Sequence, residues 1–366
     1  MNLFKSVDCQ FKVEMAEPHL GELKMGNVKT GKPAGETVKD LGEHAVIELM
    51  RGYFEAMPNI AVSFGDDVSA VPLAACAGDV AVLKADMLVA ATDVPKGMSL
   101  WQAARKSVVM NVSDFAAKGV QPQAVQVSLG LPGKMKRADL VDISKGLNTG
   151  SREYGAYVVG GDTGEACDLI VSVQVFGEAS KDALMLRGGA RVGDILAVTG
   201  LFGRSAAGLR LLLNPKLKVP SALRKALIEA VCMPKARLRE GLALAGSGAV
   251  SASIDSSDGL AWCLHELSAQ SGVGFEVSSL PVADEVQQFA DLNGLDAAEL
   301  ALYGGEEYEL VVTVKPRTWG AAEAAVAAAG GKLLRIGEAT ADKRVVLNVE
   351  GAKSEVEARG YEHFKS

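Results

Sequence analysis

The segment Tyr157-Val-Val-Gly-Gly-Asp-Thr-Gly164 is an apolar run that continues directly into two glycines and a carboxylate. Ligands of open α/β sheets bind at the ends of strands, and glycines there leave the backbone open to close approach. A Gly-Gly-Asp sequence after a strand is nevertheless more often a plain turn, because Gly and Asp are common turn residues. The segment alone therefore leaves a binding site and a turn both open.

Acidic residues recur in similar settings on both sides of this segment. The stretches are Phe64-Gly-Asp-Asp67, Lys84-Ala-Asp86, Asn111-Val-Ser-Asp114, Ile254-Asp-Ser-Ser-Asp-Gly259 and Gly304-Gly-Glu-Glu-Tyr308. Each acid has a structural alternative as a turn residue, a surface charge or a cap, and Asp114 could cap a helix that follows Ser113. Because all of them together are less easily explained in this way, we predict that the acids converge on metal ions and a polyphosphate.

Length and composition indicate an ordinary α/β protein. The 366 residues exceed one typical core, and 48% hydrophobic residues are enough to bury two. A net charge of −7 argues against a general nucleic-acid binder, which normally carries a basic surplus. The surplus of acidic residues is compatible with a protein that binds divalent cations, although ordinary surface acidity explains it equally well.

The cysteines and histidines favour a cytoplasmic protein without zinc. The five cysteines are odd in number and include no CxxC pair, which indicates reduced thiols. The four histidines are scattered, and no HExxH occurs. No apolar run approaches the roughly 20 residues of a membrane span, and the first residues lack the apolar core of a signal peptide.

Hydrophobic periodicity predicts alternating helices and strands in both halves of the chain. We expect helices at 42–54, 100–112 after an N-cap at Ser99, 137–154, 203–213, 221–231, 260–270 and 321–330, and one that Pro234 opens and that contains Arg237. We expect strands at 80–86, 124–131, 156–160, 169–176, 195–199, 250–254, 275–277, 308–314, 333–336 and 345–349. The predicted organisation is an irregular extension at 1–40, an N-terminal domain at 41–185, whose acids are the predicted metal ligands, and a C-terminal α/β domain at 186–366.

The usual nucleotide-binding motifs are absent from the sequence. There is no GxxxxGK[ST], no GxGxxG that opens a helix, no kinase HRD or DFG set and no GxSxG. Several Mg²⁺ ions held by aspartates offer another way to neutralise the phosphates of ATP and to align an in-line transfer. Arg187, in a glycine-rich segment, is the first candidate for a phosphate clamp because its planar guanidinium offers a fork of donors.

Several motifs, taken in order, resemble one family. They are Gly65-Asp-Asp67, Asp86-Met-Leu-Val89, Met110-Asn-Val-Ser-Asp-Phe-Ala-Ala-Lys-Gly119, Gly160-Gly-Asp-Thr163, Ile254-Asp-Ser-Ser-Asp-Gly259, Gly304-Gly-Glu-Glu-Tyr-Glu-Leu310 and Gly360-Tyr-Glu-His-Phe364. This set resembles the thiamine-monophosphate kinases of the aminoimidazole ribonucleotide synthetase superfamily. The resemblance implies two α/β domains, with the N-terminal sheet pairing with that of a second subunit into a dimer barrel.

The resemblance also implies roles for particular residues. Mg²⁺ would be held by Asp66, Asp86, Asp114, Asp162, Asp255 and Asp258, of which Asp114, Asp255 and Asp258 are the predicted catalytic acids. Arg187 and Ser257, with Asp162, would bind Mg-ATP, while Glu306 and Tyr361 would contact the thiamine end. The implied reaction passes the γ-phosphate of ATP directly to thiamine monophosphate and yields thiamine diphosphate and ADP.

The sequence departs from the family pattern at two places. Lys84-Ala85 replaces a Ser-Thr pair that many members carry before Asp86, and Asp93 stands where many have a substrate-contacting histidine. We expect Asp93 to accept a hydrogen bond from the aminopyrimidine of the acceptor. We expect the Lys84 ammonium to point away from the metals, or to take over a phosphate contact from a missing ion.

Two further interpretations of the function stay open. The chain could be a superfamily ATPase or synthase that phosphorylates another small acceptor, or a nucleotide-binding module without turnover. A homodimer is expected through the first domain, because its strands are apolar for much of their length, as strands covered on both faces are. The alternative is that the domain's own helices cover those strands.

Overall fold

The computed structural model describes residues 37–41, 43–58 and 79–361. All of these residues belong to one compact unit, Pro33–Ser366. Asp66 lies outside the described residues, so its role as a metal ligand stays a prediction.

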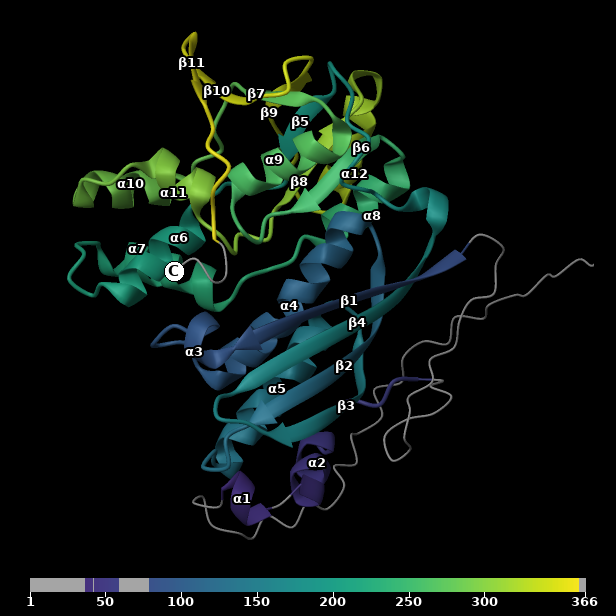
Figure 1. The fold of residues 1–366 in the computed structure, drawn as a ribbon, viewed down its shortest axis with the longest axis vertical. Coiled ribbons are helices and arrows are strands. Elements are labelled where there is room, and N and C mark those ends of the chain that lie inside the picture. The colour runs from purple at the N-terminus through teal and green to yellow at the C-terminus, as the bar shows by residue number, and fades with distance from the viewer. Residues whose placement is uncertain (1–36, 42, 59–78, 362–366) are drawn as a thin grey trace, which may run out of the picture. The chain divides into compact units, whose positions relative to one another are not determined.

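Four strands form the first sheet, in the order β1-β4-β2-β3. They are β1 (Asp79–Val89), β2 (Gln121–Leu131), β3 (Tyr157–Glu165) and β4 (Ile170–Ser180). Strand β4 runs antiparallel to both of its neighbours, whereas β2 and β3 are parallel. Figure 1 shows the helices α4 (Leu100–Lys118) and α5 (Arg137–Glu153) on one face of this sheet.

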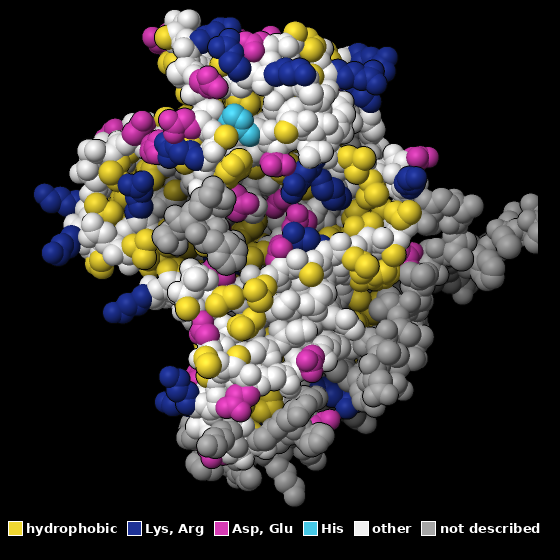
Figure 2. Space-filling model, viewed as in Figure 1, with side chains coloured by type: hydrophobic (Ala, Val, Ile, Leu, Met, Phe, Trp, Pro, Cys, Tyr) yellow, Lys and Arg dark blue, Asp and Glu magenta, His cyan; other side chains and the backbone are white. Residues whose placement is uncertain are grey.

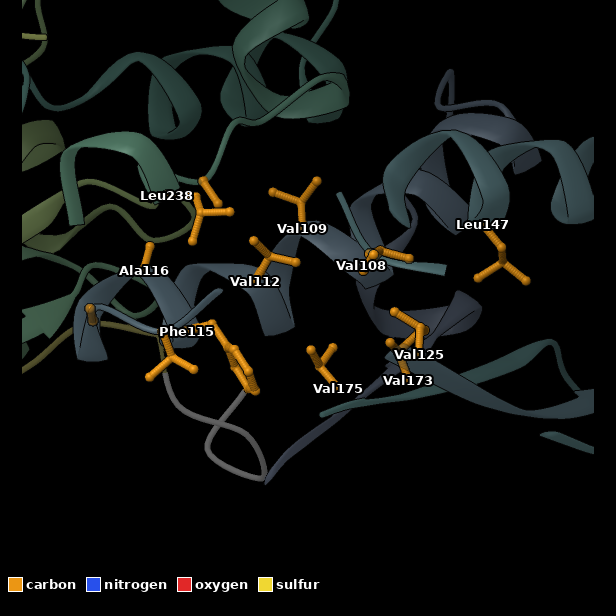
Figure 3. Packing of buried hydrophobic residues seen from close by; sticks show 14 of the residues in the cluster. Val108, Val109, Val112, Phe115, Ala116, Val125, Leu147, Val173, Val175 and Leu238 are labelled. Carbon is orange, nitrogen blue, oxygen red and sulfur yellow. The ribbon is translucent and has the colours of Figure 1, made fainter. Parts of the chain in front are cut away.

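Helix α4 lies at the centre of the larger hydrophobic core. It starts at a capping box in which Ser99 and Gln102 bond each other's backbone, and it ends at Gly119 in the left-handed conformation, with φ 69°. The predicted N-cap at Ser99 is therefore confirmed. Its apolar side chains pack toward Val125 and Val173 of the sheet on one side and toward Leu238 on another (Figure 3).

Seven strands form the second sheet, in the order β11-β10-β7-β9-β5-β8-β6. They are β5 (Ile195–Val198), β6 (Val250–Asp255), β7 (Gly274–Val277), β8 (Leu310–Val314), β9 (Leu334–Thr340), β10 (Val345–Val349) and β11 (Ala352–Glu355). Every described pairing in this sheet is antiparallel except β10 with β7. The predicted α/β class is confirmed, while the proposed boundary between 185 and 186 stays a prediction.

The remaining helices cover the sheets or extend beside them (Figure 1). They are α1 (Val38–Leu41), α2 (Glu43–Arg51), α3 (Ala90–Asp93), α6 (Arg204–Leu213), α7 (Ser221–Cys232), α8 (Leu238–Ser247), α9 (Leu260–Ser271), α10 (Asp284–Asn293), α11 (Ala297–Tyr303) and α12 (Trp319–Ala328), with 3₁₀ turns at Lys181–Ala183 and Pro316–Thr318. Among the helices that the structure describes, none is long and apolar enough to cross a membrane.

The structure corrects several local predictions. Asp114 lies inside α4, so the interpretation of Asp114 as the cap of a following helix is wrong. Helix α8 begins at Leu238, with Arg237 at its N-cap rather than inside it. The segment Gly160–Gly164 lies within β3 and is no turn, because β3 keeps pairing with β2 through these residues. Helix α1 overlaps the end of the predicted irregular extension, and α3, α10, α11 and β11 were not predicted.

Candidate active site

Three predicted acids meet where α4 lies between the two sheets. Asp86 comes from β1, Asp114 from α4 and Asp255 from the last position of β6. We call these three residues the acid cluster. Ser113 Oγ donates a hydrogen bond of 2.7 Å to Asp255 Oδ2 and so ties α4 to β6. Figure 2 shows acidic and basic side chains gathered side by side near the middle of the view, above β1.

Lys84 lies within the acid cluster. Its Nζ is 2.9 Å from Asp86 Oδ1 and 2.9 Å from Asp114 Oδ2. One of our two expectations was that the ammonium points away from the predicted metal-binding acids. That expectation is wrong.

Burial and mutual repulsion dominate the electrostatics of the acid cluster. Burial, followed by the charge of Asp255, raises the pKa of Asp114 to about 7, against the opposing effect of Lys84. Burial also raises the pKa of Asp255, while the hydrogen bond from Ser113 lowers it. Carboxylates held together under such conditions favour the binding of cations, which offset their repulsion.

One stripe of α4 faces the site. Among residues 103–118, those that are not buried are Met110, Asp114 and Lys118, spaced four residues apart and therefore on one side of the helix. Lys118 Nζ donates to the carbonyl of Ser253, 2.9 Å away. Burial, with the charge of Arg187, lowers the pKa of Lys118 to about 8. Sequence analysis gave no role to Lys118, although this four-residue spacing was a usable signal.

The loop 255–259 between β6 and α9 is fixed by backbone bonds from two distant segments. The amides of Glu306 and Tyr308 donate to the carbonyls of Ser257 and Ser256, at 2.6 and 2.8 Å. Both donor residues have positive φ, 63° and 54°. Such a conformation costs a non-glycine residue of order 1–3 kcal/mol and persists only where its surroundings enforce it.

The segment before Tyr361 secures the other side of this loop. The amide of Tyr361 donates to the carbonyl of Asp258, 3.1 Å away. A Cβ placed on Gly360 would lie 2.1 Å from that same carbonyl oxygen, so the approach requires glycine. These contacts connect Gly360 and Tyr361 to the loop, while residues 362–364 of the predicted motif lie outside the described residues.

A pocket of about 310 Å³ opens beside the loop. Its lining residues are Arg187, Ile254, Ser257, Asp258, Trp262, Cys263, Glu266 and Tyr361. We call it the Arg187 pocket. Two predicted ATP contacts, Arg187 and Ser257, thus share one pocket with the predicted metal ligand Asp258 and the predicted acceptor contact Tyr361. Arg187 Nη1 lies 3.8 Å from the Glu266 carboxylate, and both side chains are exposed enough to rearrange.

Lys106 is a buried cation that sequence analysis missed. Its side chain is 1% exposed, forms an ion pair with Glu306 and lies 3.3 Å from the carbonyl oxygen of Asp93. Lys106 therefore contacts both Glu306 and Asp93, two residues that were predicted to bind the acceptor. The Asp93 carboxylate itself accepts a hydrogen bond from the amide of Val89 at 2.7 Å, which leaves its other oxygen for a ligand.

Asp162, a predicted metal ligand, does not lie at the acid cluster within a single chain. It lies on β3, at the opposite edge of the first sheet from β1. Strands are spaced about 4.8 Å apart, so three steps separate the two edges by roughly 14 Å. Asp162 instead lines a small cavity of about 100 Å³ together with Met50, Arg51 and Phe54 from the region of α2.

The acids suit a divalent cation that arrives with a nucleotide. Within the described residues, no three His, Cys, Asp or Glu side chains are arranged as a complete metal cage. Mg²⁺ commonly uses only one or two carboxylates, with waters and substrate phosphates completing its octahedron. Asp114 and Asp255, whose charges repel each other, provide such a partial set, so the chemistry of these residues fits Mg²⁺.

Two family models match this chain. The AIR synthase related protein, N-terminal domain, matches residues 65–179, and the AIR synthase related protein, C-terminal domain, matches residues 191–350. The chain belongs to the AIR synthase related protein family. The family predicted from the motifs is thereby confirmed.

Proteins similar to this chain include thiamine-monophosphate kinases. The thiamine-monophosphate kinase of Nitrosopumilus maritimus (strain SCM1) is 35% identical over 284 residues, which cover 78% of this chain and 89% of that protein. The crystal structure of thiamine-monophosphate kinase from Stenotrophomonas maltophilia K279a matches with a TM-score of 0.74 and 27% identity, over 87% of this chain and 98% of that one. The structure of AaThiL complexed with AMPPCP and TMP matches with a TM-score of 0.70 and 29% identity, over 89% and 98% of the two chains.

Proposed function

We propose that this AIR synthase family protein is a thiamine-monophosphate kinase, which transfers the γ-phosphate of ATP to thiamine monophosphate and yields thiamine diphosphate and ADP. The observation that carries the proposal is the convergence of the acid cluster with the Arg187 pocket, in a chain that aligns along most of its length with kinases of that name. The complex of AaThiL with AMPPCP, an analogue of ATP, and with TMP supports the same pair of ligands.

The chain's own residues supply the phosphate-binding groups. Arg187 lies near Lys118, since its charge, after burial, helps to lower the pKa of Lys118, and both side chains can donate to phosphate oxygens. Asp114, Asp255 and Asp258 would hold Mg²⁺ together with those phosphates. When bound, Mg²⁺ would neutralise the negative charge that spreads over the transferring phosphoryl group.

The acceptor would lie on the Glu306 side of the site. Tyr361 is 46% exposed, and the charges of Asp93, Glu306 and Asp258 raise the pKa of its hydroxyl in addition to burial. These groups therefore surround one region of the site. A thiazolium cation fits an aromatic face with carboxylates nearby, and the pair with Lys106 fixes the position of the Glu306 carboxylate.

An assay of product formation tests the proposal. With Mg²⁺ and ATP, we expect thiamine monophosphate to give thiamine diphosphate with an equal amount of ADP. Unphosphorylated thiamine should be a poor acceptor because it lacks the attacking phosphate. Tyr361→Ala should raise the KM for thiamine monophosphate more than the KM for ATP. If ATP is turned over rapidly with another small acceptor and no thiamine diphosphate forms, the related ATPase interpretation replaces this one.

We also infer a homodimer through the outer face of the first sheet. The outward residues of β1 include Leu83, 75% exposed, and Met87, 55% exposed, next to Ala85. Apolar side chains in a row on an edge strand favour an interface. Strands β2 and β4 alternate between buried and less buried residues within one chain, so a second cover for their less buried face would come from the partner subunit.

Sedimentation velocity checks the dimer. We expect the protein to sediment at about twice the mass of a 38.1 kDa chain at micromolar concentration. Leu83→Glu should shift it to the monomer, because a charge would be buried in the interface. Leu213→Glu is the matched control, since Leu213 is 70% exposed on α6 and lies outside the first sheet. A wild-type protein that sediments only as a monomer contradicts the inference.

A cytoplasmic location belongs to the same proposal, because that compartment supplies ATP. It is supported by the thiols of Cys167, Cys232 and Cys263, which are unpaired in the part of the chain that the structure describes.

A further inference from the structure

The backbone of β1 determines where Lys84 lies. In a strand, alternate side chains share a face. Lys84 and Asp86 therefore share the inner face with Leu88, which is fully buried, while Leu83 and Met87 occupy the outer face. Register confirms this arrangement, since Lys84 and Asp86 pair with Val175 and Val173, both of which are buried against α4.

The ammonium lies between two carboxylates that are both predicted metal ligands. Lys84 Nζ is 2.9 Å from one oxygen of Asp86 and 2.9 Å from one oxygen of Asp114, which come from different elements. The side chain of Lys84 is 31% exposed, and those of Asp86 and Asp114 are 31% and 21% exposed. The lysine thus bridges β1 and α4 in a partly dry environment, where charges interact more strongly than in water.

A divalent ion and this ammonium exclude each other from the same position. Two cations at one position repel each other, and they do so more strongly in a partly dry environment than in water. The oxygens that such an ion would share, Asp86 Oδ1 and Asp114 Oδ2, are already paired with the ammonium. The two carboxylates are therefore bridged either by the lysine or by a metal ion.

We propose that Lys84 is a built-in cation of the acid cluster, which takes the place of one divalent ion between Asp86 and Asp114. The protein accordingly binds its nucleotide with one divalent ion fewer than the same cluster would without the lysine. This inference rests on the proposed function, because it concerns the ions that accompany ATP.

The number of bound ions tests this role directly. Free Mn²⁺ is measured by electron paramagnetic resonance during titration of the protein in the presence of saturating AMPPCP. We expect Lys84→Ala to bind one more Mn²⁺ per chain at saturation than the wild type. Lys84→Arg, which keeps the charge, and Lys134→Ala, at an exposed turn lysine, should both bind the wild-type number. Equal numbers in Lys84→Ala and the wild type overturn the proposal.

Thermal unfolding provides a second readout that does not depend on catalysis. Without the ammonium, the carboxylates of Asp86 and Asp114 repel each other. Added Mn²⁺ should therefore raise the Tm of Lys84→Ala more than that of the wild type. Lys84→Met retains the apolar stem and serves if the alanine variant fails to fold. An equal Tm increase in variant and wild type also contradicts the proposal. Failure of the kinase proposal would show instead as absent thiamine diphosphate, whereas the Mn²⁺ count needs no acceptor.

Discussion

Replacing Asp114 with asparagine is expected to lower kcat by on the order of 100-fold or more. The substitution retains the size of the side chain on α4 but removes a charge from the acid cluster. Phosphoryl transfer depends on cations positioned in advance at the oxygens that gain charge, and those cations depend on the carboxylates. Steady-state kinetics with thiamine monophosphate and Mg-ATP measures the effect.

Asp258→Asn is expected to behave in the same way from the other side of the site, where Asp258 lines the Arg187 pocket. Asp182→Asn is the matched control, because Asp182 is exposed in the turn after β4. Both test variants should still unfold in a single thermal transition. Turnover near the wild-type rate in both of them would remove the basis for the metal-binding role of these acids.

Glu306→Ala is expected to lower the free energy of unfolding by about 3 kcal/mol. The reason is Lys106, whose side chain is 1% exposed and would remain charged and buried without its carboxylate partner. Glu306 is 33% exposed, which places the expected cost at the low end for a broken buried pair. Urea unfolding without ligands measures this cost separately from any effect on the acceptor.

A second substitution separates a lost ion pair from lost packing. Lys106→Met in the Glu306→Ala background removes the unpaired charge and should recover most of the stability. Glu338→Ala is the matched control, since its pair with Arg335 is over half exposed on both sides and should contribute less than about 1 kcal/mol. An unchanged urea midpoint for Glu306→Ala would mean that Lys106 finds another partner.

Much of the fold follows from local sequence patterns. Ser99 marks the start of α4 correctly because N-capping is a local interaction within one turn of helix. The strand ending at Asp255 was likewise predictable, since Val250, Ala252 and Ile254 alternate with serines, as in a strand, and an acid follows. Helix α10 escaped prediction although its buried Val286, Phe289 and Ala290 follow the helical i, i+3, i+4 spacing, so a usable signal was present.

The site was harder to predict because it depends on which distant elements meet. Lys106 and Lys118 resemble the solvated lysines of an ordinary surface helix, but α4 is covered on nearly all sides, so one lysine is buried and the other lines the site. Asp162 resembles the other acids in sequence, yet strand order places it at the far sheet edge. The distance between Asp162 and Asp86 follows from the order of the strands in the sheet, which the local sequence around each acid does not reveal.

The packing of helix α4 affects the order in which the chain can fold during its synthesis. Its side chains pack on the first sheet and also on Leu238 of α8, which the ribosome synthesises much later (Figure 3). Until that segment emerges, one side of α4 has no native cover, and the growing chain exposes an apolar surface of the kind that chaperones bind. We therefore expect this side of α4 to gain its native cover only after the second half of the chain has been synthesised.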